Sequence, residues 1–217
     1  MLNCRLNSNH GEALTILCLG AHSDDIELGC GGTILKLIED HERTELYWVV
    51  FSSNKKRRQE AAASARAFLE KAKRKTVVIK SFRDGFFPYS GREIKTCFER
   101  LKEKVAPDVV FTHYRSDLHQ DHRVISDLAW NTFRNHLILE YEIPKYDGDL
   151  GSPNFFVHLT ESLCKQKINL LVKYFKSQRE NQWFDRETFQ SLLRLRGIES
   201  NAPDKYAEAF YCRKLVL

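Results

Sequence analysis

Stretches typical of buried strands and stretches typical of helices alternate through the first 134 residues of the chain. The strand-type stretches are short, apolar and rich in β-branched or aromatic residues, and they span residues 14–21, 45–53, 76–82 and 107–113. The helix-type stretches that follow them span residues 31–41, 57–73, 92–105 and 121–134. Because strands that alternate with helices form right-handed βαβ units, this order predicts a parallel sheet covered by helices on both faces.

The last third of the chain has a different order. Strands are expected at residues 137–144 and 154–160, on either side of the turn-rich "KYDGDLGSP". Two helices, at 162–178 and 185–197, and a last strand at 209–217 complete it. No linker divides the sequence, so residues 1–217 are expected to form one α/β domain.

Composition limits the class of protein and its surroundings. The chain has 217 residues, 42% hydrophobic and 29% charged, as in soluble globular proteins. No segment is long and apolar enough to span a membrane, and the polar N-terminus does not resemble a secretory signal. Six cysteines lie scattered without C-x-x-C spacing, which indicates reduced thiols and a cytoplasmic protein.

The net charge of +5 favours anionic partners only weakly. The densest basic stretch is "NKKRRQ" at residues 54–59, and no aromatic residues interleave with its charges. Single-stranded nucleic acids are usually bound by basic and aromatic side chains together. We therefore interpret this stretch as a solvated helix face and expect no nucleic-acid partner.

Residues suited to metal binding follow two of the expected strands. His22, Asp24 and Asp25 come after the first strand, and "THYRSDLHQDHR" after the fourth adds a second group: His113, His119, Asp121 and His122. Ligand sites of open α/β sheets lie at the carboxyl ends of the strands. Imidazole and carboxylate together suit zinc or another first-row divalent ion. The glycines at 29–32 lack the G-x-G-x-x-G spacing of a dinucleotide site, so they are expected to allow a tight turn and a close helix.

Two motifs resemble the signatures of one enzyme family. "AHSDDIELGCGGT" at residues 21–33 resembles the A-H-P-D-D signature of the PIG-L/LmbE-like deacetylases, and "HQDHR" at 119–123 resembles their H-P-D-H-R signature. With "RRQEAAASARAFL" and "FRDG", the resemblance reaches across residues 14–134. It implies a Rossmann-like fold and zinc-dependent removal of N-acetyl groups, commonly from N-acetylglucosamine-containing substrates. Ser23 replaces the usual proline, and Ile26 replaces a frequent acidic residue, so no role is carried over to Glu27.

The resemblance gives the two neighbouring aspartates different roles. It implies that His22, Asp25 and His122 bind zinc, with one ion per chain. It also implies that Asp24 is the general base for a water activated by the metal, and the donor to the departing amine.

Further roles implied by the resemblance are electrostatic and substrate-binding. His119 would stabilise the oxyanion, and Asp121 would orient that imidazole and raise its pKa. Some family members have an assisting tyrosine two residues before this histidine, where this chain has Asp117. Arg57 and Asp84 match positions that bind sugar hydroxyls, although Lys56 and Arg58 compete with Arg57 for that register.

The sequence thus predicts a cytoplasmic zinc hydrolase that removes the N-acetyl group from a small-molecule amino-sugar conjugate of the GlcNAc type. A homo-oligomer is compatible with this prediction but not required by it. One alternative is a metal-dependent amidase that acts on a non-sugar amide. The other is a non-catalytic metal-holding protein, although metal binding alone gives Asp24 no role.

Overall fold

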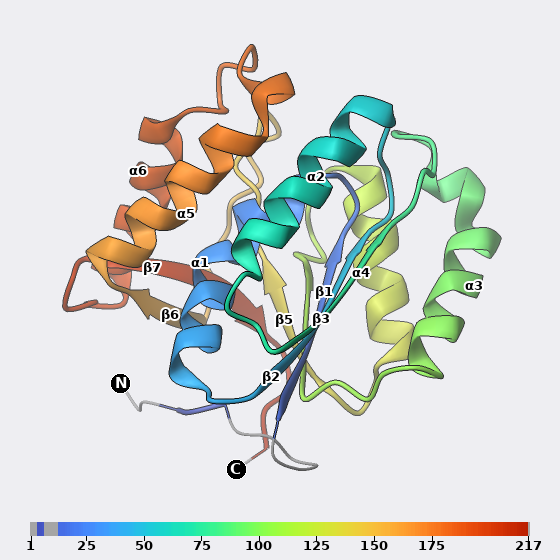
Figure 1. Ribbon diagram of the computed structural model, residues 1–217, viewed down its shortest axis with the longest axis horizontal. Helices are drawn as coiled ribbons and strands as arrows, with labels where there is room; N and C mark the ends of the chain where they lie inside the picture. Colours follow the sequence, from blue (N-terminus) through green and yellow to red (C-terminus); the bar gives the residue numbers. More distant parts are fainter. Residues whose placement is uncertain (1–3, 7–12, 217) are drawn as a thin grey trace.

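The computed structural model describes residues 4–6 and 13–216, and seven strands in this part of the chain form one sheet (Figure 1). The strand order across the sheet is β3-β2-β1-β4-β5-β7-β6. The first five strands in this order run parallel, whereas β7 pairs antiparallel with both β5 and β6. The strands are β1 (Leu14–Gly20), β2 (Thr44–Val50), β3 (Arg74–Ile79), β4 (Val109–His113), β5 (Leu137–Tyr141), β6 (Phe155–Leu159) and β7 (Tyr206–Cys212).

Helices cover both faces of the sheet. Figure 1 shows α3 and α4 on one face and α1, α2 and α5 on the other, with α6 packed beside α5 against β7. The α-helices are α1 (Asp25–Asp40), α2 (Lys55–Phe68), α3 (Gly91–Lys102), α4 (Gln120–Thr132), α5 (Glu161–Tyr174) and α6 (Arg186–Glu199). Two short 3₁₀ helices, η1 (Phe87–Ser90) and η2 (Lys176–Gln178), precede α3 and follow α5.

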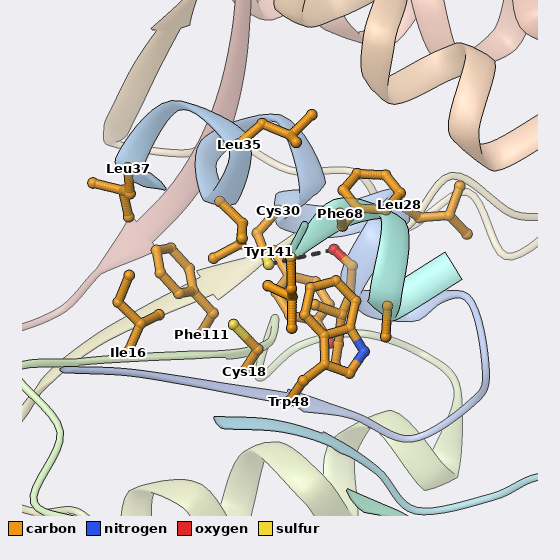
Figure 2. Packing of buried hydrophobic residues seen from close by; sticks show 14 of the residues in the cluster. Ile16, Cys18, Leu28, Cys30, Leu35, Leu37, Trp48, Phe68, Phe111 and Tyr141 are labelled. Atoms are coloured by element: carbon orange, nitrogen blue, oxygen red, sulfur yellow. Dashed lines mark hydrogen bonds between the residues drawn. The ribbon is translucent and has the colours of Figure 1, made fainter. Parts of the chain in front are cut away.

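Each face of the sheet has its own hydrophobic core. Ile16, Trp48 and Phe111 point from the strands toward α1 and α2, and Figure 2 shows them packed with Phe68 and Cys30. On the other face, Leu17, Phe51 and Val110 pack against Phe98 and Ile125 of α3 and α4. Burial of alternate strand residues on opposite faces explains the nearly continuous apolar runs in the sequence.

Tyr141 and Gly29 fix how closely α1 approaches the sheet. A Cβ atom at Gly29 would lie 2.1 Å from Cδ2 of Tyr141, which is far inside van der Waals contact. The Tyr141 ring is fully buried and its hydroxyl donates to the Leu19 carbonyl at 2.6 Å, so it has little freedom to move. Only glycine permits this packing, and the packing places the first turn of α1 over the ends of β1 and β5.

A buried ion pair ties the C-terminal strand to the same helix. Glu208 of β7 accepts hydrogen bonds from the backbone N–H groups of Gly32 at 2.8 Å and Thr33 at 2.6 Å. Lys167 of α5 pairs with Glu208 at 2.6 Å and donates to the Leu28 carbonyl at 2.6 Å. Glu208 and Lys167 thus neutralise each other's charge and form hydrogen bonds with backbone groups in the middle of α1. Buried charges without such partners would destabilise the fold.

The predicted α/β fold with a mainly parallel sheet is confirmed, and most predicted elements are found with shifted ends. The largest error is α1, which begins at Asp25 rather than at residue 31. The glycines therefore lie inside the helix and make no turn there, although the expected close packing of the helix is confirmed. The last strand ends at Cys212, and Leu217 lies outside the described residues, as does much of the polar N-terminus.

Three smaller expectations bear on surface and environment. None of the helices in residues 4–6 and 13–216 is long and apolar enough to cross a bilayer. All six cysteines are free, and Cys18, Cys30 and Cys164 are buried. The basic stretch 54–59 opens α2 and is largely exposed, as expected of a solvated helix face, with one exception at Arg57.

Gly29→Ala is expected to destabilise the fold, because its methyl group would collide with the buried Tyr141 ring. Overpacking of this kind costs about 1–3 kcal/mol or more. Gly91→Ala is the matched control, since Gly91 is helical and a Cβ there meets nothing within 4 Å. Thermal unfolding should show a clear loss for Gly29→Ala and no loss for Gly91→Ala. Equal melting temperatures for both variants would contradict this account of the packing.

Candidate metal centre

The two groups of polar residues meet because β1 and β4 are neighbours. These strands pair in parallel, with Cys18 opposite Phe111, so their carboxyl ends lie at the same edge of the sheet. The short connection from β1 to α1 carries residues 21–24, and the longer one from β4 to α4 carries residues 114–119. All the side chains predicted for metal binding and catalysis therefore converge at this edge.

Three of these side chains bring one ligand atom each into a tight group. His22 Nδ1 lies 3.1 Å from His122 Nε2 and 3.4 Å from Asp25 Oδ2. The remaining separation, between His122 Nε2 and Asp25 Oδ2, is 3.6 Å. All three residues are buried. The structure thus brings together His22, Asp25 and His122, the three residues expected to bind the metal.

The outward-facing nitrogens of both histidines are held by carboxylates. His122 Nδ1 lies 2.9 Å from Asp117 Oδ2, and His22 Nε2 lies 3.1 Å from Asp84 Oδ1 and 3.3 Å from Asp121 Oδ2. Ionised carboxylates only accept hydrogen bonds, so these nitrogens are the donors and each neutral ring turns its lone pair inward. Two imidazole lone pairs and a carboxylate oxygen then face one another. A bound cation would remove the electrostatic repulsion among these three electron-rich atoms.

Without a metal, a proton is the available cation. Burial lowers the pKa of His22, but Asp25, Asp121 and Asp84 outweigh it, so the pKa lies well above its usual value. Burial and the neighbouring His113 lower the pKa of His122 to about 3, which keeps that ring neutral and able to bind a metal. Burial opposes ionisation of Asp25, but His122, His113 and His22 hold the pKa of this carboxyl well below its usual range.

Asp24 and Arg57 form a pair beside this group. Asp24 is the N-cap of α1 but makes no side-chain capping bond, because its Oδ1 accepts a hydrogen bond from Arg57 Nη2 at 2.5 Å. Burial raises the pKa of Asp24, and Arg57 opposes that shift. Arg58 instead donates to the Ile79 carbonyl at 2.6 Å, so of these two arginines Arg57 is the one that contacts Asp24.

The structure corrects the expected relation between His119 and Asp121. His119 is the N-cap of α4, and its Nδ1 accepts from the backbone N–H of Asp121 at 3.2 Å. The Asp121 carboxylate instead accepts hydrogen bonds from the backbone of Gly85 and Phe87 and contacts His22. Burial first, and then His22, lower the pKa of His119 despite the opposing charge of Asp121. Asp121 thus raises this pKa as expected, but burial and His22 outweigh it. Because Nδ1 accepts a hydrogen bond, the proton of a neutral His119 ring lies on Nε2.

Asp84, one of the two residues expected to bind sugar, lies at the exposed rim of the group. Its side chain is 60% exposed, whereas the side chains of His22 and Asp121 are largely covered. A hydrogen bond with His22 is the main cause of the lowered pKa of Asp84. The rim position places this carboxylate between solvent and the buried donors.

Three more residues complete the site: the sequence assigns no role to Asp117 or Lys145, and it places His113 only in the group of polar residues after the fourth strand. Asp117 accepts a hydrogen bond from His122 Nδ1 and so orients that ring. The D-x-H-x-D-H spacing of residues 117–122 is a sequence signal for this contact, but from the sequence Asp117 is interpreted only as standing where some family members have a tyrosine. Lys145 pairs with Asp117 at 3.1 Å, and no sequence motif points to it. His113 Nε2 lies 3.2 Å from Asp25 Oδ2, and His113 belongs with Asp25 and His122 to a group close enough to hold a metal ion. Its Nε2 lone pair, however, accepts a hydrogen bond from Ala21 N at 2.9 Å.

Several groups of potential ligands overlap at this site. In the part of the chain that the structure describes, three sets of side chains have ligand atoms within 4.8 Å of one another: His22, His119 and His122; Asp25, His113 and His122; and His22, Asp84 and Asp121. All three sets belong to one centre. The centre is therefore suited to a metal ion bound by imidazole and carboxylate.

Comparison with known families identifies the class of protein. The model of the PIG-L family, described as GlcNAc-PI de-N-acetylase, matches residues 17–133, which is more than half of the chain. This segment contains every residue predicted for metal binding, catalysis and substrate contact. The chain belongs to the PIG-L family.

Solved structures with the same fold include proteins of different activity. An N,N'-diacetylchitobiose deacetylase from Pyrococcus horikoshii is 23% identical, with a TM-score of 0.69 over 91% of this chain and 83% of that chain. The conserved protein TT1542 from Thermus thermophilus is 22% identical, with a TM-score of 0.70 over 94% and 96%. GalB, a 4-carboxy-2-hydroxymuconate hydratase from Pseudomonas putida, is 16% identical, with a TM-score of 0.70 over 94% and 98%. These likenesses establish the fold.

One divalent ion per chain is expected to bind, because the overlapping groups form a single centre. His122→Ala should abolish binding, whereas His158→Ala on the edge strand β6 should not. Affinity should fall as the pH is lowered, because protons compete for His22 Nδ1 and its pKa is raised. Equilibrium dialysis followed by elemental analysis measures all three effects. Retention of the ion by His122→Ala would contradict the assignment.

Proposed function

We propose that the protein is a zinc-dependent hydrolase that removes the N-acetyl group from an amino-sugar conjugate of the GlcNAc type. The observation that carries the proposal is the close grouping of three donor atoms beside the buried carboxylate of Asp24. That grouping lies within the segment that matches the PIG-L family. In this proposal His22, Asp25 and His122 hold the ion, and Asp24 is free to act on water.

The donor set fits zinc in both chemistry and spacing. Catalytic zinc sites use three protein ligands drawn from histidine, carboxylate and cysteine, and they leave a fourth position open. With bonds of 2.0–2.1 Å, the ligand atoms of a tetrahedral site lie about 3.3 Å apart. The separations of 3.1, 3.4 and 3.6 Å between the three donor atoms support such a site.

The residues around this centre supply the steps of amide hydrolysis. Zinc held there would supply Lewis acidity, which polarises an amide carbonyl and makes water more acidic. Asp24 takes a proton from the attacking water at Oδ2, because Arg57 holds its Oδ1, and it passes that proton to the departing amine. His119 donates from Nε2 to the carbonyl oxygen as negative charge develops there.

Substrate contact is proposed for the rim of the centre. Asp84 offers an exposed carboxylate that can accept hydrogen bonds from sugar hydroxyls. Arg57 is the second proposed contact, and its bond to Asp24 couples substrate position to the general base. The chitobiose deacetylase that shares the fold acts on an acetylated sugar, and this supports a sugar substrate here.

The alternatives are an amidase for non-sugar amides and a protein that only holds metal. GalB adds that the same fold also serves a hydratase, so the fold alone does not select the reaction. Acetate release from N-acetylated amino sugars, compared with release from simple acetamides, tests the proposal directly. Acetate release from neither class by zinc-loaded protein would reject it.

Asp24→Asn is expected to retain zinc and to lower kcat by about 10²-fold or more, the scale of general acid–base catalysis. Asparagine preserves the side-chain shape but cannot take up the proton. Asp108→Asn, directly before β4, is a control at a carboxylate that accepts a hydrogen bond from the Thr15 backbone N–H. Acetate release and zinc content are measured on the same samples. Loss of zinc from Asp24→Asn, with retention by Asp25→Asn, would reverse the two assignments.

Asp84→Ala is expected to lower kcat/KM for N-acetyl sugars by roughly 5- to 150-fold, which corresponds to about 1–3 kcal/mol, because sugar hydroxyls lose their acceptor. A small acetamide that cannot reach residue 84 should be hydrolysed as slowly by the variant as by the wild type. Asp40→Ala, at the exposed end of α1, is the control. Steady-state kinetics with both substrates distinguish the outcomes. Unchanged kcat/KM for sugars in Asp84→Ala would remove this residue from substrate recognition.

A further inference from the structure

We propose that Lys145, in the loop after β5, is a positioning residue that sets the metal affinity of the centre through Asp117 and His122. The contacts form a chain: Lys145 Nζ lies 3.1 Å from Asp117 Oδ2, and the same oxygen lies 2.9 Å from His122 Nδ1. The inference rests on the proposed function only in taking His122 as a metal ligand.

The chain of contacts is shielded from solvent. The exposed fractions of the side chains are 10% for Lys145, 3% for Asp117 and 3% for His122. Screening by water and salt is weak for buried groups, so each contact constrains its neighbours more strongly than a surface ion pair would.

Asp149 fastens the same loop at a second point. It pairs with Lys145, and its Oδ2 accepts a hydrogen bond from Leu118 N at 2.8 Å. The other oxygen of Asp117, Oδ1, accepts from His119 N at 2.8 Å. The loop after β5 therefore holds the segment 117–119, which lies directly before the metal-binding turn of α4.

Lys145 is the ammonium group shared by two buried carboxylates. Without this ammonium group, the negative charges of Asp117 and Asp149 would be buried close together with no positive charge between them. Burial of uncompensated charges costs free energy. The two carboxylates would move apart or bind water between them. Asp117 would then leave the position in which its Oδ2 accepts a hydrogen bond from His122 Nδ1. A carboxylate in that position fixes the ring of a metal-binding histidine and raises its basicity.

Zinc affinity, measured by competition with a chromogenic chelator, tests the proposal without a turnover assay. Asp117→Ala is expected to weaken zinc binding by roughly 10–100-fold, as for other partners of metal-binding histidines. Lys145→Met is expected to weaken it by roughly tenfold, the lower end of that range. The double variant should bind no more weakly than Asp117→Ala alone, because Lys145 acts through Asp117.

Asp147→Asn is the matched control, because it removes the charge of a more exposed carboxylate 3.7 Å from Lys145 Nζ in the same loop but leaves the contacts of Lys145 with Asp117 and Asp149. It is expected to keep zinc affinity within about threefold, well inside the effect of losing a direct partner. Thermal melts establish that each variant is folded, and Lys145→Gln replaces Lys145→Met if the latter does not fold.

Three results would overturn the proposal. Wild-type affinity in a folded Lys145→Met or Lys145→Gln variant would show that the ammonium group has no effect on the centre. Fully additive losses in the double variant would show that Lys145 does not act through Asp117. A wild-type protein that binds no zinc would reject the proposed function as well, so the two failures are distinguishable.

Discussion

Parallel pairing of β1 with β4 is the constraint on which the site depends. It places residues that are about ninety positions apart in the sequence, such as His22 and His113, at one edge of the sheet. The position of α1 then fixes Asp24 and Asp25, and Gly29 allows that helix to lie against Tyr141. Tyr141 also contacts His113 through its hydroxyl, so the packing of the core and the geometry of the centre share one side chain.

Charge is distributed unevenly around the centre. Asp24, Asp25, Asp117 and Asp121 are all buried, and Arg57 and Lys145 each contact one of them. The remaining negative charge is concentrated around His22, whose pKa is raised as a result. Folding thus creates a place in which a positive charge is required, and a divalent ion satisfies that requirement better than a single proton.

Much of the fold and the composition of the centre could be predicted from the sequence. The alternation of strands and helices predicts the parallel sheet, and the positions of two groups of polar residues after two strands predict that these groups meet. The resemblance to the PIG-L/LmbE-like deacetylases then implies which of them, His22, Asp25 and His122, would bind the metal. The antiparallel insertion of β7 between β5 and β6 could not be predicted, because strand order depends on long-range packing. The early start of α1 was missed because glycines have low helix propensity, and tertiary contacts outweigh it here.

The pair formed by Lys167 and Glu208 has a consequence for how the protein can be divided. A fragment that ended at residue 134 would contain every residue proposed for catalysis, but it would lack β5, β7 and the Glu208 carboxylate that binds the backbone of α1. The open edge of β4 would then be exposed, and the helix that carries Asp25 would have lost much of its support. The smallest autonomous folding unit therefore extends well beyond the segment that carries the chemistry.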